Sequence, residues 1–216
     1  MHSRTLYKIE KYDLPEEEIL AKNLFRVFVF GLPRSGTSMM TRICEILGVK
    51  MIHTSEEKKH DYAHLGGEYH PNETGFYEIT KNILAHYMEI AATPYSGCKM
   101  IIPVTNHRLE LVLMVPSKVI LMWRDPEEIR QSQNAFYANN VDSAYFKTAL
   151  VTQKLRLKEL KIDHLIVEYR NVIQNPREEI QKVKEFIQSD RGIDEAVEFV
   201  NPEAYRFNRD KIVEGL

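Results

Sequence analysis

Two short stretches of the chain are apolar at nearly every position. They span residues 25–30 and residues 118–123, the second of which has the sequence KVILMW. Strands that are buried on both faces of a parallel sheet have this pattern, because helices cover them on either side. Shorter runs of the same kind occur at residues 49–52, 99–104 and 164–167. The pattern therefore predicts about five strands.

Segments with helical character separate these strands. Helices are predicted over residues 36–47, 76–92, 126–137, 143–160 and 176–188, with one more near the N-terminus over residues 15–22. Pro15 and Pro126 are each followed by glutamates, which suits the first turn of a helix. Gly48 suits the end of the helix over residues 36–47. Strands that alternate with helices predict a three-layer α/β fold, in which helices flank both faces of a central parallel sheet.

The length of the chain predicts one domain over residues 1–216. Neither a linker nor an internal repeat divides the 216 residues. Residues 53–75 are polar, rich in His and Gly, and without periodicity. Because ordinary connections have about 4–6 residues, a loop this long is expected to be functional or mobile.

Charge and cysteine content narrow the possible partners. The net charge is −2, from 29 Lys and Arg against 31 Asp and Glu. This balance argues against a nucleic-acid partner and against a membrane surface, so an anionic ligand requires a local cluster of cations. The two cysteines form no C-x-x-C pair, which favours a reducing compartment. Residues 1–14 lack the apolar core of a signal peptide, and no run is long enough to span a bilayer, so a cytoplasmic location is expected.

The segment that joins the first buried strand to the next helix resembles a phosphate-binding loop. Gly31-x-x-x-x-Gly36-Thr37-Ser38 has the Walker spacing G-x-x-x-x-G-K-[ST], with Thr37 in place of the lysine. The glycines allow backbone N–H groups to point at an anion, and the helix N-terminus and two hydroxyls add to them. Arg34 offers a planar fork suited to a tetrahedral oxyanion. These features favour a P-loop NTPase-like fold whose loop binds one phosphate without metal-assisted triphosphate chemistry. The alternative is a glycine turn that only joins the strand to the helix.

A second candidate anion site follows the other clear strand. Arg124 stands at the carboxyl end of residues 118–123, and Ser132 follows on the predicted helix. Open α/β sheets bind ligands at this edge, so both side chains are expected to converge on a further phosphate. The alternative for Arg124 is an ion pair with Asp125 or Glu128. Together with the loop, Arg124 and Ser132 indicate a ligand that has two separate phosphate groups.

Three segments resemble, in order and spacing, the nucleotide-binding segments of the sulfotransferase family. They are GLPRSGTS, VILMWRDPEEIRQS and VEYRNVIQNPREEIQKVKEFI. The resemblance implies 3′-phosphoadenosine 5′-phosphosulfate as the donor, adenosine 3′,5′-bisphosphate as its product, and no metal. The first segment has arginine where cytosolic members have lysine, as in the bacterial and tyrosylprotein branches. The R-K-G segment that cytosolic members carry near the C-terminus is not visible here.

The resemblance also implies a role for each matching residue. The 5′-phosphosulfate would be held by Arg34, Ser35, Gly36, Thr37 and Ser38. Arg124 and Ser132 would hold the 3′-phosphate, and Tyr169 would lie by the adenine. Lys99 matches a strand lysine near the transferring sulfuryl group. The alternative for Lys99 is a lysine that only extends from the strand end to solvent.

Sulfuryl transfer requires donors to the leaving oxygen and a base at the acceptor. Arg34, Lys99 and the loop N–H groups are the predicted donors to the developing charge. The arginine branch has a glutamate base at a similar distance beyond the arginine, which places Glu56 first, with one inserted residue, and Glu78 second. His53 and His107 follow as candidates. Each of these four residues could instead be a solvated surface group.

The loop over residues 53–75 contains four histidines, of which His60 and His64 have a spacing that a metal could use. No strand or helix pattern fixes them, so a lid that shapes the acceptor pocket is favoured over a metal site. The sequence indicates neither the oligomeric state nor which small molecule or glycan is the acceptor. Rival functions are a P-loop kinase of nucleotides or small molecules, and a non-catalytic nucleotide-binding module.

Overall fold

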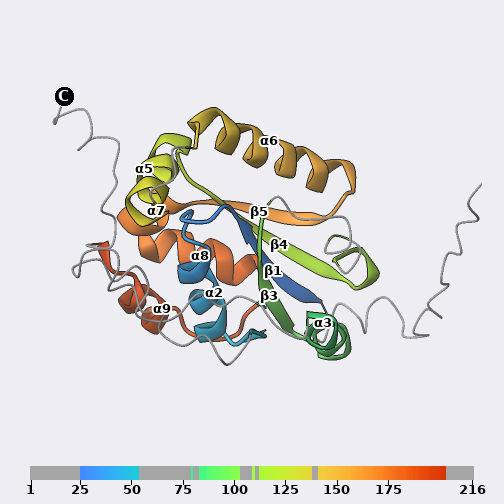
Figure 1. Ribbon diagram of the computed structural model, residues 1–216. Coiled ribbons are helices and arrows are strands. Elements are labelled where there is room, and N and C mark those ends of the chain that lie inside the picture. The colour runs from blue at the N-terminus through green and yellow to red at the C-terminus, as the bar shows by residue number, and fades with distance from the viewer. Residues whose placement is uncertain are drawn as a thin grey trace, which may run out of the picture.

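The computed structural model (Figure 1) describes residues 25–53, 83–102, 112–137 and 141–202, together with Ile79 and Leu109. At its centre is a five-stranded sheet in which all neighbouring strands are parallel. The strand order is β2-β3-β1-β4-β5. The strands are β1 (Arg26–Gly31), β2 (Lys50–Met51), β3 (Ser96–Ile101), β4 (Ser117–Trp123) and β5 (Asp163–Glu168). The prediction of a parallel sheet of about five strands is confirmed.

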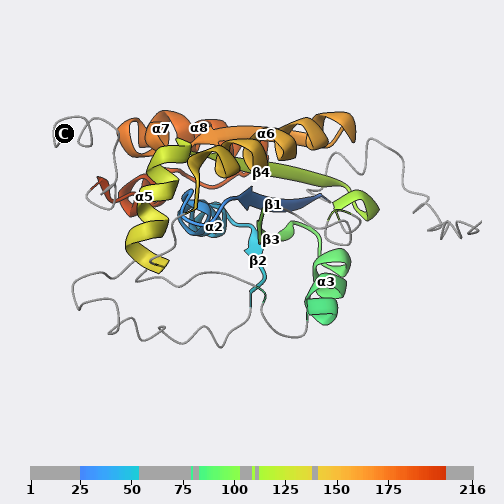
Figure 2. The ribbon, with the colours of Figure 1, turned by 45° about the horizontal axis from the view of Figure 1, so that its top comes forward.

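Helices cover both faces of this sheet and make it the middle of three layers (Figures 1 and 2). The helices on one face are α2 (Thr37–Ile46), α7 (Tyr169–Gln174), α8 (Pro176–Phe186) and α9 (Asp194–Phe199). Those on the other face are α3 (Ile83–Ala92), α5 (Pro126–Tyr137) and α6 (Ser143–Glu159). The three-layer α/β arrangement predicted from the sequence is therefore correct.

Strand β1 shows why the fold has two hydrophobic cores. Val27 and Val29 belong to the core that includes α2 and α8, whereas Phe28 and Phe30 belong to the core that includes α5 and α6. All four side chains are fully buried. Because consecutive side chains of a strand point to opposite faces, a strand with helices on both sides has to be apolar at every position. This accounts for the uninterrupted apolar run in the sequence.

Some elements differ from those expected. Strand β3 begins at Ser96, three residues before the predicted start at Lys99. The prediction missed Ser96, Gly97 and Cys98 because they lack the bulky apolar side chains that mark the other strands. Helices α7 and α9 were not predicted, since six residues are too few to show helical periodicity. The predicted helix over residues 15–22, the loop over residues 53–75 apart from His53, and nearly all of residues 76–82 lie outside the described residues.

Gly97 provides a test of the strand pairing at the centre of the sheet. It pairs with Val27 of β1, and a Cβ atom built at Gly97 would overlap the carbonyl oxygen of Val27. We expect Gly97→Ala to lower the free energy of unfolding by at least about 3 kcal/mol, because neither backbone can move without breaking the ladder. For a chain of this size this corresponds to a loss of roughly 6–12 °C in melting temperature, measured by calorimetry.

Gly192 is the matched control for this substitution, because a Cβ atom there would have no neighbour within 4 Å. Gly192→Ala should change the free energy of unfolding by less than about 0.5 kcal/mol. Equal stability of the two alanine variants would show that the register of β1 and β3 differs from the one described.

The described residues also bear on charge and cysteine chemistry. Cys44 and Cys98 are both buried and unbridged, and burial raises the pKa of the Cys44 thiol, which keeps it protonated.

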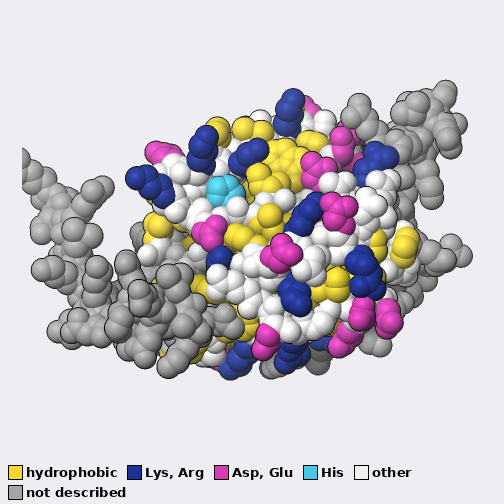
Figure 3. Space-filling model, turned by 180° about the vertical axis from the view of Figure 1, so that it is seen from behind, with side chains coloured by type: hydrophobic (Ala, Val, Ile, Leu, Met, Phe, Trp, Pro, Cys, Tyr) yellow, Lys and Arg dark blue, Asp and Glu magenta, His cyan; other side chains and the backbone are white. Residues whose placement is uncertain are grey.

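On the face shown in Figure 3, basic and acidic side chains are interspersed among the described residues. None of the helices within the described ranges is long and apolar enough to cross a bilayer.

Candidate active site

The loop between β1 and α2 forms a tight backbone turn. Arg34 and Gly36 both have positive φ angles, of 70° and 91°. Ser35 closes the turn, because its N–H and its hydroxyl both donate to the carbonyl oxygen of Leu32, at 3.1 and 2.7 Å. At Gly31 a Cβ atom would lie only 2.5 Å from the Ser35 oxygen, so the loop folds back onto the strand end. A turn of this kind at the start of a helix is the geometry that anion-binding loops use.

Lys99 reaches this loop from the neighbouring strand. It pairs with Val29 in the sheet, and its Nζ donates to the hydroxyl of Ser38 at 3.2 Å. Lys99 is only 5% exposed. The structure thus places a buried ammonium group at the start of α2, where a Walker lysine would otherwise supply one from the loop itself. This position disagrees with a lysine that extends to solvent, and the catalytic role of Lys99 stays a prediction.

Arg124 lies directly after β4 and contacts the loop. Its Nη1 donates to the carbonyl oxygen of Arg34 at 2.8 Å, and its Nε donates to Glu128 at 3.1 Å. The ion pair with Glu128, considered as an alternative role for Arg124, is therefore present together with the loop contact. Asp125 instead accepts hydrogen bonds from the backbone N–H groups of Glu127 and Glu128. It thereby begins α5 in the manner of a capping residue.

Helix α5 is joined to the same loop by two further contacts. Arg34 donates from Nε to the hydroxyl of Ser132 at 3.1 Å, and Ser132 is buried. Gln133 donates from its side chain to the carbonyl oxygen of Pro33 at 3.4 Å. The resemblance assigned Arg34 to one phosphate group and Ser132 to the other. The structure brings the two side chains together, so that Arg34 lies between the two predicted sites.

Tyr169, the first residue of α7, lies beneath this cluster. Its ring centroid is 4.6 Å from the guanidinium carbon of Arg124, close enough for a cation–π interaction. Its ring also fills the space beside Gly36, where a Cβ atom would overlap it. Tyr169 is buried in the same core as α2 and α8. Tyr169 thus packs against both the loop and Arg124. Its predicted position beside an adenine stays a prediction.

The site elements share one edge of the sheet. Strands β1, β4 and β5 are neighbours and parallel, so the loop after β1, Arg124 after β4 and Tyr169 after β5 all lie at the carboxyl ends of adjacent strands (Figure 1). This is the edge at which open α/β sheets bind ligands. The convergence of Arg34, Arg124 and Ser132 follows from this topology.

Five of the candidate residues lie outside the part of the chain that the structure describes. They are Glu56, Glu78, His107, His60 and His64. Their proposed roles stay predictions, as does the absence of a metal. In the part of the chain that the structure describes, no group of three His, Cys, Asp or Glu side chains could hold a metal ion.

The part that Glu128 plays in the candidate site was underestimated from the sequence. Glu128 appeared only as an alternative partner of Arg124, yet its carboxylate is buried within the cluster. The signal that could have identified it is its spacing, because residues i and i+4 lie on one face of a helix.

A glycine loop at the carboxyl edge of a parallel sheet, surrounded by buried cations and hydroxyls, defines an α/β protein of the P-loop type that binds phosphate groups. The chain belongs to the sulfotransferase family, because the family model described as a sulfotransferase domain matches residues 26–198. The resemblance recognised in the three sequence segments is thereby confirmed. Members of this family are enzymes that transfer sulfuryl groups, and this class of activity extends to the chain.

Solved structures agree with this fold. The sulfotransferase domain of the Synechococcus PCC 7002 olefin synthase has a TM-score of 0.51 and 16% identity, over 87% of this chain and 82% of that one. Mouse sulfotransferase SULT7A1, solved in complex with PAP, has a TM-score of 0.51 and 17% identity, over 87% of this chain and 66% of that one. At such identities the likeness concerns the fold alone. A comparison with curated protein sequences found no significant match.

Proposed function

We propose that the protein transfers a sulfuryl group from 3′-phosphoadenosine 5′-phosphosulfate to a hydroxyl or amine of a small-molecule or glycan acceptor. The observation that carries the proposal is the joining of two anion sites through Arg34, which contacts Arg124 through its carbonyl and Ser132 through its side chain. The family assignment supports the reaction class. The PAP bound to the mouse relative is the product that this donor leaves.

The residues of the cluster fit a nucleotide with phosphates at both ends of its ribose. The loop over residues 31–36, with its positive φ angles, and the Lys99–Ser38 pair form a compact, cationic cradle for the 5′ end. Arg124 and Ser132 supply a guanidinium and a hydroxyl for the 3′-phosphate. Guanidinium groups suit phosphate oxygens because they offer paired donors in a fixed plane.

The donor supplies the activated sulfuryl group, and the protein supplies the charge that its departure requires. We assign Lys99 and Arg34 to the oxygen on which negative charge develops as the sulfuryl group leaves. Both are cations held at the loop by side-chain hydrogen bonds, so they need no rearrangement to meet that charge. We further propose that the transfer proceeds without a metal, since Thr37 replaces the lysine that triphosphate users combine with Mg²⁺.

The acceptor requires a general base, and the candidates keep the order that the resemblance gives them. Glu56 comes first and Glu78 second. Loss of sulfuryl transfer without loss of nucleotide binding in Glu56→Gln, and not in Glu78→Gln, would support the first choice. The reverse pattern would transfer the role to Glu78.

Nucleotide binding separates this proposal from a kinase. We expect adenosine 3′,5′-bisphosphate to raise the melting temperature in the presence of EDTA. At a ligand concentration of 100 times Kd, one-site binding stabilises the folded state by about 2.7 kcal/mol, or roughly 5–10 °C for a chain of this size. Thermal unfolding with the bisphosphate, with AMP and with Mg·ATP measures this. Stabilisation by Mg·ATP alone would contradict the proposal.

Turnover is tested by incubating the protein with sulfur-35-labelled donor and a panel of sugars, phenols, lipids and peptides. Transfer of label to one acceptor class is the expected result. Binding of the bisphosphate without transfer to any acceptor or to water would indicate a nucleotide-binding module instead of an enzyme.

A further inference from the structure

Glu128 is a buried carboxylate beside Arg124, in a site that is proposed to bind anions. Its side chain is 3% exposed, and that of its partner Arg124 is 7% exposed. A carboxylate so deeply buried is costly unless a cation and hydrogen bonds compensate it. It also repels the phosphate groups that the site attracts. Its presence therefore requires a reason other than direct binding of the nucleotide.

The contacts of Arg124 indicate that reason. A guanidinium is planar, so contacts along its edges and on its face restrict its orientation. Glu128 holds the Nε edge at 3.1 Å, and the carbonyl oxygen of Arg34 holds Nη1 at 2.8 Å. The ring of Tyr169 lies against the face, 4.6 Å from the central carbon. Of these three contacts, only the one from Glu128 carries a full opposite charge.

The same orientation supports the loop. Arg34 is a non-glycine residue with a φ angle of 70°, a backbone conformation that costs free energy and persists where the surroundings hold it. Its carbonyl is the group that Arg124 binds. Glu128 is thus linked to the backbone of the loop only indirectly, through Arg124.

We propose that Glu128 is a positioning residue that fixes the Arg124 guanidinium for the 3′-phosphate and so produces the preference for a 3′-phosphorylated nucleotide. This inference rests on the proposed function. A merely structural role for Glu128 makes a different prediction, since loss of stability would affect every nucleotide alike. The ratio of two affinities distinguishes the two roles.

The experiment measures the Kd of adenosine 3′,5′-bisphosphate and of AMP by titration calorimetry. Their ratio is the preference for the 3′-phosphate. Glu128→Gln keeps the size and one acceptor oxygen but removes the charge. We expect it to lower the preference about tenfold, because a charge-assisted hydrogen bond becomes a neutral one and Arg124 is held less firmly. The affinity for AMP should change less than about threefold.

Glu127 offers the matched control. It lies one position earlier on α5 and pairs with Arg130 at the surface, where the side chains are 37% and 31% exposed. Arg130 lowers the pKa of the Glu127 carboxyl, which is therefore ionised at neutral pH. Glu127→Gln thus makes the same charge change without touching Arg124. It should leave the preference unchanged within about twofold.

A second comparison tests whether Glu128 acts through Arg124. In the Arg124→Ala background the carboxylate has no Arg124 guanidinium left to orient, so adding Glu128→Gln should leave the preference unchanged. An unchanged preference in Glu128→Gln alone would overturn the inference. So would an equal loss with and without Arg124. If the wild-type protein shows no preference for the bisphosphate, the proposed function itself fails, and the inference fails with it.

Discussion

Lys99→Met is expected to lower kcat by about two to three orders of magnitude. Methionine has a similar length and suits the buried position, so the substitution removes the ammonium group and little else. That group lies 3.2 Å from the Ser38 hydroxyl at the start of α2. Removing one preorganised donor from a site of developing charge typically has an effect of this size. Because the charge develops in the transition state, kcat should change more than nucleotide affinity.

The measurement requires kcat with the acceptor found in the labelled-donor screen, and the Kd of adenosine 3′,5′-bisphosphate for the same variant. The Kd is expected to rise by less than about tenfold, since the 5′-phosphate retains the loop and Arg34. A kcat within about threefold of wild type would show that Lys99 only packs beside the loop.

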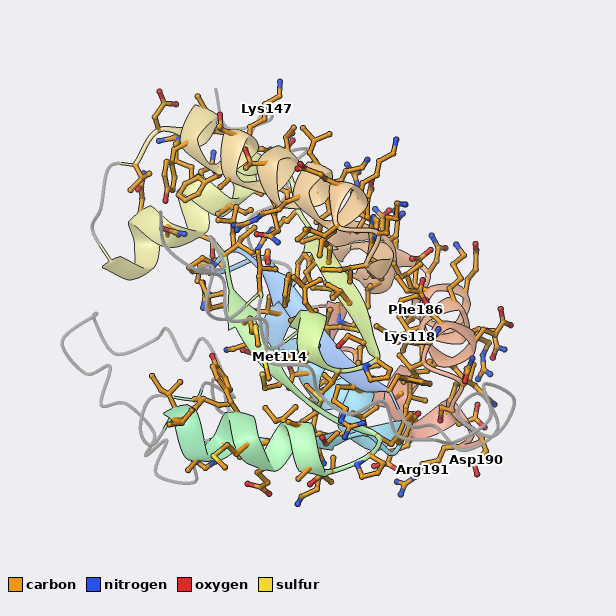
Figure 4. All side chains as sticks on the ribbon, turned by 90° about the vertical axis from the view of Figure 1, so that its right-hand side faces the viewer. Met114, Lys118, Lys147, Phe186, Asp190 and Arg191 are labelled. Atoms are coloured by element: carbon orange, nitrogen blue, oxygen red, sulfur yellow. The ribbon has the colours of Figure 1, made fainter. Side chains whose placement is uncertain are left out.

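Lys118 provides the control for this substitution. It lies near the beginning of β4, opposite Val27, whereas the loop follows the carboxyl end of β1. Figure 4 shows it beside Phe186, and its Nζ lies 4.7 Å from that ring and 2.9 Å from Asp163. Lys118→Met should therefore lower stability modestly and leave kcat unchanged. Comparing the two variants separates the general effect of replacing a lysine by methionine from the effect of removing the Lys99 ammonium group at the loop.

The fold was predictable where side-chain chemistry is uniform along an element. β1 and β4 are apolar throughout because each lies between two helical layers, and the sequence shows this directly. β3 begins with Ser96 and Gly97, which give no such signal. Gly97 is there because the carbonyl of Val27 leaves no room for a side chain. A requirement imposed by a partner strand is not visible in the strand's own sequence.

The sequence identified individual residues of the candidate site, but not the contacts between them. Motif spacing selected Arg34, Lys99 and Arg124 individually. The bond from Arg34 to Ser132 joins residues 98 positions apart, and the bond from Lys99 to Ser38 joins residues 61 apart. Such contacts depend on the order of strands in the sheet, which local patterns do not determine. Only the folded structure shows that Lys99 donates to Ser38 while Arg34 donates to Ser132 in the same site.

Arg124→Ala is expected to weaken binding of adenosine 3′,5′-bisphosphate about 100-fold while changing AMP affinity less than about threefold. Two charge-assisted hydrogen bonds from a buried guanidinium to a phosphate account for a loss of this size. AMP lacks the 3′-phosphate and so does not depend on them. Titration calorimetry on both nucleotides measures the difference. Equal weakening of the two would mean that Arg124 supports the loop and does not bind the 3′-phosphate.

The substitution also affects folding, and the design has to separate the two effects. Arg124→Ala removes one partner of a buried ion pair and leaves the Glu128 carboxylate buried, a change that typically costs about 3–5 kcal/mol. The double variant Arg124→Ala with Glu128→Gln removes both charges and should recover most of this stability. Because it also lacks the guanidinium, its bisphosphate affinity should stay as low as that of the single variant. Arg130→Ala, which removes a surface arginine from α5, should change neither affinity. Recovered stability with weak binding of the bisphosphate would therefore assign the loss to the missing guanidinium and not to partial unfolding.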